Sequence, residues 1–130
     1  MPYPENFAPR LLAAVAALAL SGTAVSAGVI TSGLQIEAGQ TFELGGGQKG
    51  SFTVTGRNTG PVAVVVYGLA EDARAPVERG TMAPGGAVNA AFGPGEQALL
   101  RNTSSMETAR LKLKISGDTS SLGMTYAANP

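Results

Sequence analysis

The sequence predicts an all-β domain, an antiparallel β-sandwich of immunoglobulin-like or jelly-roll-like type with eight or nine short strands, preceded by a signal-peptide helix. Segments with strand character recur at intervals of about 10 residues, and Gly, Pro or Asn stands at most of the breaks between them. No segment after residue 27 carries a helical apolar stripe of useful length. Residues 104–107 match a helix capping box, but a strand pattern begins at Arg110, so at most one helical turn fits.

Residues 1–27 have the pattern of a secretory signal. A run of ten apolar residues follows Arg10, and small residues lead up to Ala27. We therefore expect cleavage between Ala27 and Gly28, which leaves residues 28–130 as a single domain. The alternative is an uncleaved membrane anchor, because residues 11–27 are close to the minimum length of a membrane span.

The expected strands follow in chain order. They cover residues 34–37, 41–44, 51–57, 62–69, 77–82, 87–92, 96–102, 110–115 and 122–126. Most of these segments alternate between apolar and polar residues, which is the pattern of a strand with one face towards the core and one towards water. In the last segment Leu122, Met124 and Tyr126 fall on one face, which we expect to be core.

The segment 62–69 differs because it is apolar throughout, and we predict that it is the central strand, covered on both faces. Val65 and Tyr67 are then largely covered. The residues between it and segment 51–57 include Asn, Gly and Pro, which favour a tight reversal. We therefore expect these two segments to form a β-hairpin.

The composition excludes several chemistries. The chain has no Cys and no His, which removes disulfides, thiolate catalysis, Cys-based metal sites and a Ser-His-Asp mechanism. Gly45, Gly47 and Gly50 match G-x-G-x-x-G, but a strand follows where a dinucleotide site needs a helix, so we interpret them as a loop. We expect no catalytic residues, no cofactor and no metal.

A basic row lies on one face of the expected strand 110–115. Arg110, Lys112 and Lys114 alternate there with apolar residues. The functional interpretation is an anionic partner such as a polysaccharide or a lipid headgroup. The structural interpretation, which we favour, is a solvated face or the lysine protection of an edge strand.

The segment after the expected cleavage site, residues 28–33, is small and apolar, and we expect a loose arm. Its residues Val29, Ile30 and Thr31 are β-branched and uncharged, and they could pair with a sheet edge. The hypothesis is that this arm, or the edge beside it, mediates self-association or docks a protein partner through backbone hydrogen bonds. The common alternative for such a terminus is disorder.

The balanced charge and the absence of Cys indicate the kind of partner and the source of the protein. After removal of residues 1–27, which contain Glu5 and Arg10, eight acidic and eight basic residues remain, so no pull towards nucleic acid is expected. A secreted domain without disulfides is typical of bacteria. The sequence favours a secreted or periplasmic, non-catalytic module with a structural, adhesion or protein-binding role at the bacterial envelope or exterior. The alternative is a domain that binds a glycan or a small polar ligand.

Overall fold

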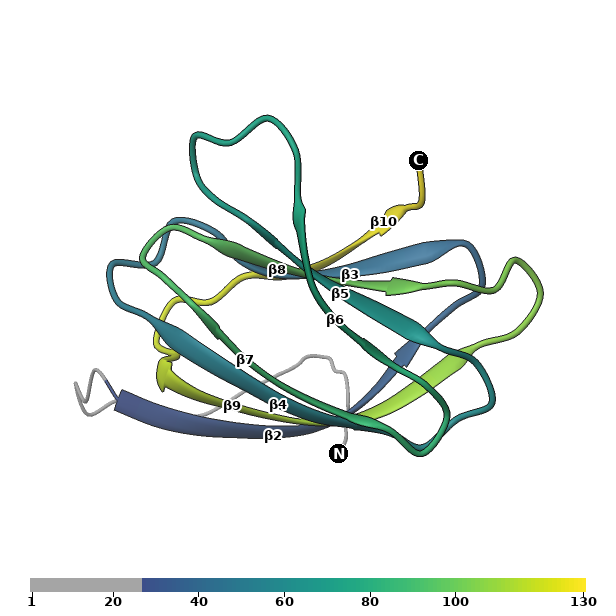
Figure 1. Cartoon of the computed structure of the whole chain (residues 1–130). Helices are drawn as coiled ribbons and strands as arrows, with labels where there is room; N and C mark the ends of the chain where they lie inside the picture. The colour runs from purple at the N-terminus through teal and green to yellow at the C-terminus, as the bar shows by residue number, and fades with distance from the viewer. Residues whose placement is uncertain (1–26) are drawn as a thin grey trace.

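The computed structural model describes residues 27–130, which form nine β-strands and no helix (Figure 1). The strands are β2 (Ala27–Ile36), β3 (Gln40–Gly45), β4 (Phe52–Asn58), β5 (Val64–Leu69), β6 (Val77–Met82), β7 (Ala87–Phe92), β8 (Gln97–Asn102), β9 (Ala109–Asp118) and β10 (Met124–Ala128). The predicted all-β class is confirmed. The expected signal segment lies outside the described residues, apart from Ala27, and stays a prediction.

The strands form two antiparallel sheets with a nested order. One sheet has the order β10-β3-β8-β5-β6 and the other the order β2-β9-β4-β7. The first half of the chain pairs with the second half in reverse: β2 with β9, β3 with β8, β4 with β7 and β5 with β6. Successive pairs fall alternately in the two sheets, and β10 extends one edge beside β3.

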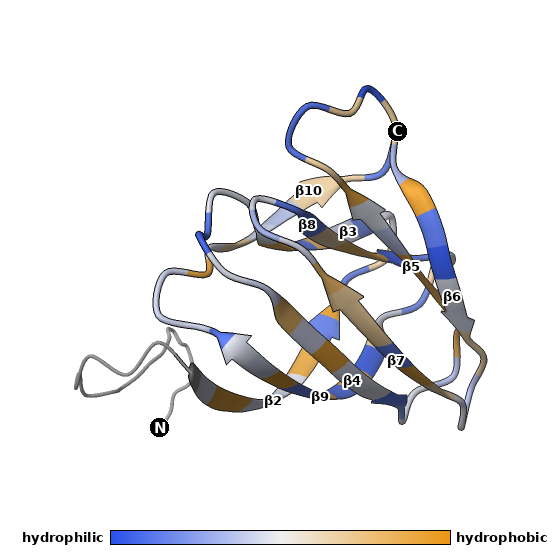
Figure 2. Cartoon of the chain, turned by 60° about the vertical axis from the view of Figure 1, so that its left-hand side comes forward, coloured by the Kyte–Doolittle hydropathy of each residue, from blue (hydrophilic) through white to orange (hydrophobic). Residues whose placement is uncertain are grey.

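The two sheets face each other across one hydrophobic core (Figure 1). Hydrophobic and polar residues alternate along several strands, as the banded colouring in Figure 2 shows, and the period of a strand turns alternate side chains towards the core. On β9, for example, Leu111, Leu113 and Ile115 are buried while the residues between them are exposed. The rings of Phe52 and Phe92 stack in the core with their centroids 5.1 Å apart.

The predicted hairpin of residues 51–69 is wrong. β4 and β5 belong to different sheets, and the residues between them cross from one layer to the other. β4 instead pairs with β9 and β7. Both segments were recognised as strands, but a local pattern carries no information on which sheet a strand joins.

β5 is buried on one face only. Val64 and Val66 have no exposed surface, whereas Val65 and Tyr67 on the other face are partly exposed. β8 and β6 flank β5 within its sheet, and among residues 27–130 no further sheet or helix covers its outer face. The prediction of a strand covered on both faces was therefore wrong, and the apolar run reflects β-propensity as well as burial.

Both ends of the described chain differ from expectation. Residues 28–33 form no loose arm but belong to β2, which pairs with β9 over ten consecutive residue pairs. On β10, Met124 and Tyr126 are 46% and 50% exposed, because β10 is an edge strand that the opposite layer covers poorly. Of the expected apolar face, Leu122 packs against the core.

Two asparagines, each followed by Thr, end strands with their side chains buried. Asn58 ends β4 and donates hydrogen bonds to the carbonyls of Val62 (2.7 Å) and Met82 (2.9 Å). Asn102 ends β8 and donates to the carbonyls of Ile36 (2.9 Å) and Glu107 (2.8 Å). Each side-chain oxygen accepts a bond from the N–H two residues on, so these side chains fix both a turn and a crossing of the chain.

Candidate functional site

The basic row lies on the outer face of the four-stranded sheet. Arg110, Lys112 and Lys114 are exposed on β9, and their neighbours in sequence point into the core. β9 lies between β2 and β4, so it is an interior strand and the interpretation as edge protection is wrong. What remains of the structural interpretation is a solvated face.

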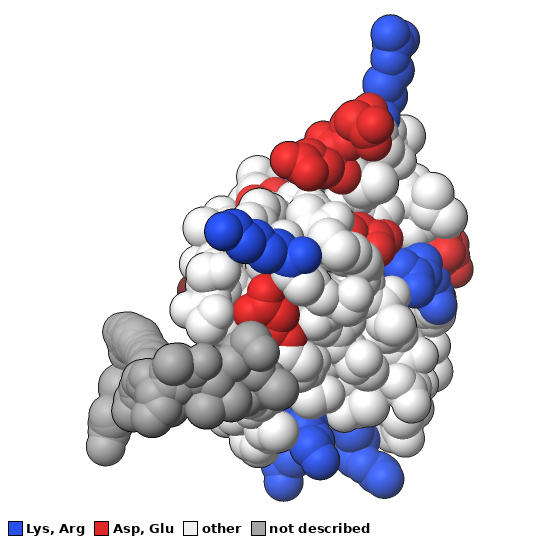
Figure 3. Space-filling model, turned by 90° about the vertical axis from the view of Figure 1, so that its left-hand side faces the viewer, with Lys and Arg blue, Asp and Glu red and all other residues white. Residues whose placement is uncertain are grey.

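The structure adds Arg57 to this row. Arg57 is exposed on β4 and lies directly opposite Lys112 in the register of β4 with β9. The four residues Arg57, Arg110, Lys112 and Lys114 are called the basic face below. The alternation of residues 51–57 places Arg57 on the solvent side of its strand, but the pairing of β4 with β9 cannot be derived from the sequence. Blue atoms project from the lower side of the molecule in Figure 3, beneath the sheet that contains β9.

The N-terminal residues that the sequence singled out lie beside this face. Thr31 is the register partner of Lys114 and Val29 that of Ser116, so both side chains share the outer side of the sheet. Val29 is 61% exposed. Ile30 points the other way, opposite Ile115, and packs against the core. The structure thus brings two separate predicted features onto adjacent strands.

The backbone of β2 presents a row of hydrogen-bonding groups to the free edge of the sheet. In β9 the carbonyl of Arg110 accepts a hydrogen bond of 2.9 Å from the N–H of Thr59, which follows β4. Residues of a strand turn their backbone groups alternately to one side and the other, so Arg110 and every second residue after it face β4. Their register partners on β2 therefore face away from β9. These partners are Gln35, Gly33, Thr31 and Val29.

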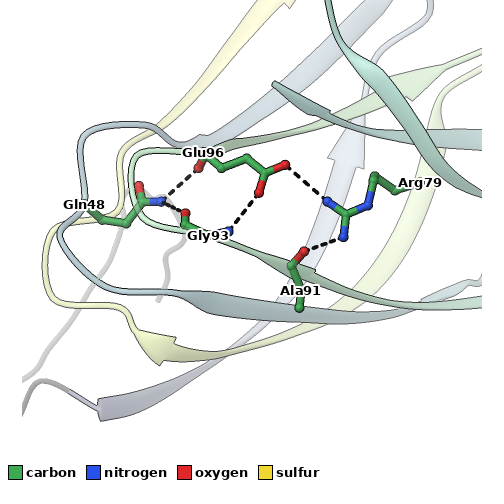
Figure 4. A network of polar contacts seen from close by, with 5 residues as sticks. All are labelled: Gln48, Arg79, Ala91, Gly93 and Glu96. Carbon is green, nitrogen blue, oxygen red and sulfur yellow. Dashed lines mark hydrogen bonds and ion pairs between the residues drawn. The ribbon is translucent and has the colours of Figure 1, made fainter. Parts of the chain in front are cut away.

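The opposite side of the molecule, where β6 and β7 form the sheet edges, is closed by Arg79 (Figure 4). The register of β5 with β6 shifts between Val66 and Tyr67, which leaves Arg79 as an extra residue in a β-bulge. Its guanidinium donates to the carbonyl of Ala91 on β7 (2.5 Å) and to the carboxylate of Glu96 (3.2 Å), and it lies 4.9 Å above the Phe92 ring.

The Arg79 contacts are held by a second set of bonds in the same close-up (Figure 4). Glu96 also accepts from the N–H of Gly93 (2.8 Å), and the buried Gln48 donates to the carbonyls of Gly93 (3.1 Å) and Glu96 (2.9 Å). The bulge and this network are features that natural edge strands use against further pairing. No pattern in the sequence indicates the bulge or this network.

Tyr126 on β10 connects the two sheets on the side of the molecule where β10 and β2 are the edge strands. Its ring centroid lies 5.3 Å from that of Phe42, and its hydroxyl donates to the carbonyl of Gln35 on β2 at 3.0 Å. Burial, together with the nearby charge of Glu37, raises the pKa of the Tyr126 hydroxyl above its ordinary value. The contact covers one carbonyl near the end of β2 and leaves Val29, Thr31 and Gly33 beyond its reach.

The predicted cleavage residues Ala27 and Gly28 stand at the start of β2, so a chain beginning at Gly28 would keep nine of its ten residues. Gly45, Gly47 and Gly50 lie in or next to the loop from β3 to β4, and a strand follows them, as expected.

Within the described residues no helix could span a membrane, and no group of three or more His, Cys, Asp or Glu is arranged to hold a metal. Comparison with protein-family models, curated proteins and solved structures finds no match.

Proposed function

We propose that the protein is a secreted or periplasmic, non-catalytic β-sandwich module of the bacterial envelope or exterior that assembles through its β2 edge. The nested pairing of its strands is that of a jelly roll with one added strand, a topology used by binding and shell-forming domains. Because jelly rolls serve many unrelated functions, the fold alone indicates none of them, and the β2 edge is what supports the proposal.

The observation that carries the proposal is the contrast between β2 and the other edges. β2 is ten residues long, pairs with β9 without a bulge, and contains no charged residue and no Pro. β6 carries a bulge, a carbonyl of β7 is bonded to Arg79, and β10 is five residues long. Long, flat and uncharged edges template the addition of another strand, whereas bulged, blocked or short edges resist it.

The partner that fits best is a second copy of the same chain. Two β2 edges can pair antiparallel about a twofold axis, which joins two four-stranded sheets into one continuous sheet. The predicted mature chain has no net charge, so little long-range repulsion opposes the approach of two copies. Each copy offers backbone donors and acceptors at Val29, Thr31 and Gly33.

The experiment is a pair of substitutions at Thr31. Thr31→Pro removes the N–H that faces the free edge and leaves the bonds between β2 and β9 in place, whereas Thr31→Val keeps the N–H and the branched shape. Sedimentation velocity at several concentrations should show assembly of the wild type and of Thr31→Val, and a monomer for Thr31→Pro. A monomeric wild type at all concentrations, or unchanged assembly of Thr31→Pro, would refute the proposal. Deletion of residues 28–32 is a poorer test because it would uncover β9.

A further inference from the structure

The basic face concentrates charge of one sign on the interior of a sheet. It holds four of the eight Lys and Arg residues of residues 28–130. Lys112 has Arg57 directly opposite it across the strand pair, and Arg110 and Lys114 lie two residues away on the same face of β9, a spacing of about 7 Å. All these separations are shorter than the screening length of about 8 Å at physiological ionic strength.

Few acidic residues balance this array, and Glu37, which follows β2, lies two residues beyond Gln35, the register partner of Arg110. β2, β4 and β7 contain no Asp or Glu, and the single acid of β9, Asp118, is four residues beyond Lys114. The Asp118 carboxylate already accepts hydrogen bonds from the N–H of Gly50 (2.8 Å) and the hydroxyl of Ser120 (3.1 Å). Like charges directly opposite one another destabilise a sheet. The pair of Arg57 and Lys112 is therefore locally unfavourable, and the face is suited to a ligand that brings negative charge.

The neighbouring side chains narrow the kind of anion. Thr31, Thr53 and Thr55 lie on the same outer face as the cations and offer hydroxyl groups. β7 contributes Ala87, Asn89 and Ala91 to that face, so the side chains there are small and uncharged. Of the large hydrophobic residues of the four strands, only Val29 is exposed, and no aromatic ring is. Single-stranded nucleic acid is bound by stacking its bases on exposed aromatic rings, and a membrane surface is bound by inserting exposed apolar side chains. The outer face of this sheet is therefore poorly suited to either of these ligands.

We propose that the basic face binds a linear acidic polysaccharide. The carboxylates of successive acidic sugars pair with Arg57, Arg110, Lys112 and Lys114, and the threonine hydroxyls bond to sugar hydroxyls. Arginine matches a carboxylate with two parallel N–H donors, and lysine supplies a point charge. The four cations of the site lie on β4 and β9, so its charge does not depend on the β2 edge, and Thr31 is the one contact that β2 supplies.

The test is binding of the full mature chain to polygalacturonate, with neutral dextran as the control polymer. The wild type should bind polygalacturonate and not dextran, with affinity falling about tenfold or more between 50 and 200 mM salt. Arg57→Gln combined with Lys112→Gln should weaken binding about tenfold. The matched variant, Arg74→Gln combined with Arg101→Gln, makes the same change of net charge away from the four-stranded sheet and should bind like the wild type.

Two further measurements keep the proposal open to refutation. The melting temperature of the Arg57→Gln and Lys112→Gln double variant should be equal to or higher than that of the wild type, because a like-charge pair is removed. Equal weakening by the matched variant, or absence of binding to polygalacturonate at 50 mM salt, would overturn the proposal. Tighter binding to double-stranded DNA or to phosphatidylglycerol vesicles than to polygalacturonate would overturn the assignment of a polysaccharide.

Discussion

Replacing Asn58 with alanine should destabilise the fold strongly although the change removes little apolar surface. The Asn58 side chain is 1% exposed and makes three hydrogen bonds, to the carbonyls of Val62 and Met82 and from the N–H of Gly60. These bonds tie the end of β4 in one sheet to the end of β6 in the other. Alanine leaves all three backbone groups without their partner.

The loss of unfolding free energy in Asn58→Ala depends on how deeply each of the three hydrogen bonds is buried. The bond to the Met82 carbonyl is buried, so its loss costs about 1 to 3 kcal/mol. The other two bonds are partly buried, and water can replace part of each, which leaves about 0.5 to 1 kcal/mol apiece. The total is about 2 to 5 kcal/mol, which lowers the melting temperature of a domain of this size by roughly 8 to 40 °C.

Thermal unfolding followed by circular dichroism measures this shift. The matched control is Asn89→Ala, because Asn89 is exposed on β7 and its loss should change stability by less than about 0.5 kcal/mol. Equal shifts for the two variants, or a shift below about 3 °C for Asn58→Ala, would refute the account of the chain crossing.

Three other outcomes are expected. Val66→Asp places a carboxylate in the core and should abolish folding, whereas Thr53→Asp should change stability by less than about 1 kcal/mol; similar melting shifts would contradict the assignment of faces. The raised pKa of Tyr126 stabilises the fold below the unfolded-state value of 10.0, and this stability is lost as pH rises through the folded-state pKa. Urea midpoints from pH 9 upwards should therefore fall less steeply for Tyr126→Phe, and equal slopes would contradict the shift. Intact mass of the exported protein should show a chain that begins at Gly28, and a mass that retains residues 11–20 would revive the membrane anchor.

Local patterns predicted the strands well. Val77–Met82 and Ala87–Phe92 were predicted with the bounds that the structure shows, because Gly and Pro mark their ends. The alternation of Arg110–Ile115 correctly divided β9 into an inner and an outer face. These features depend on neighbours in sequence, which a single sequence displays.

Pairing was not predictable. β2 pairs with β9, about 80 residues further on, and nothing in the small residues of 28–33 indicates that partner. For the same reason the sequence does not assign Arg57 to the basic face, since the position of Arg57 beside Lys112 depends on the register of β4 with β9. Nor does the sequence indicate that the Asn102 side chain is buried and donates hydrogen bonds to two backbone carbonyls.

Amide hydrogen exchange, resolved by residue and compared at low and high protein concentration, tests the β2 edge most directly. The N–H groups of Thr31 and Gly33 face the free edge, and those of Ile30 and Ser32 face β9. We predict that Ile30 and Ser32 are protected at both concentrations, whereas Thr31 and Gly33 exchange fast in the dilute monomer and become protected at high concentration. Fast exchange of Thr31 and Gly33 at both concentrations would contradict assembly through this edge.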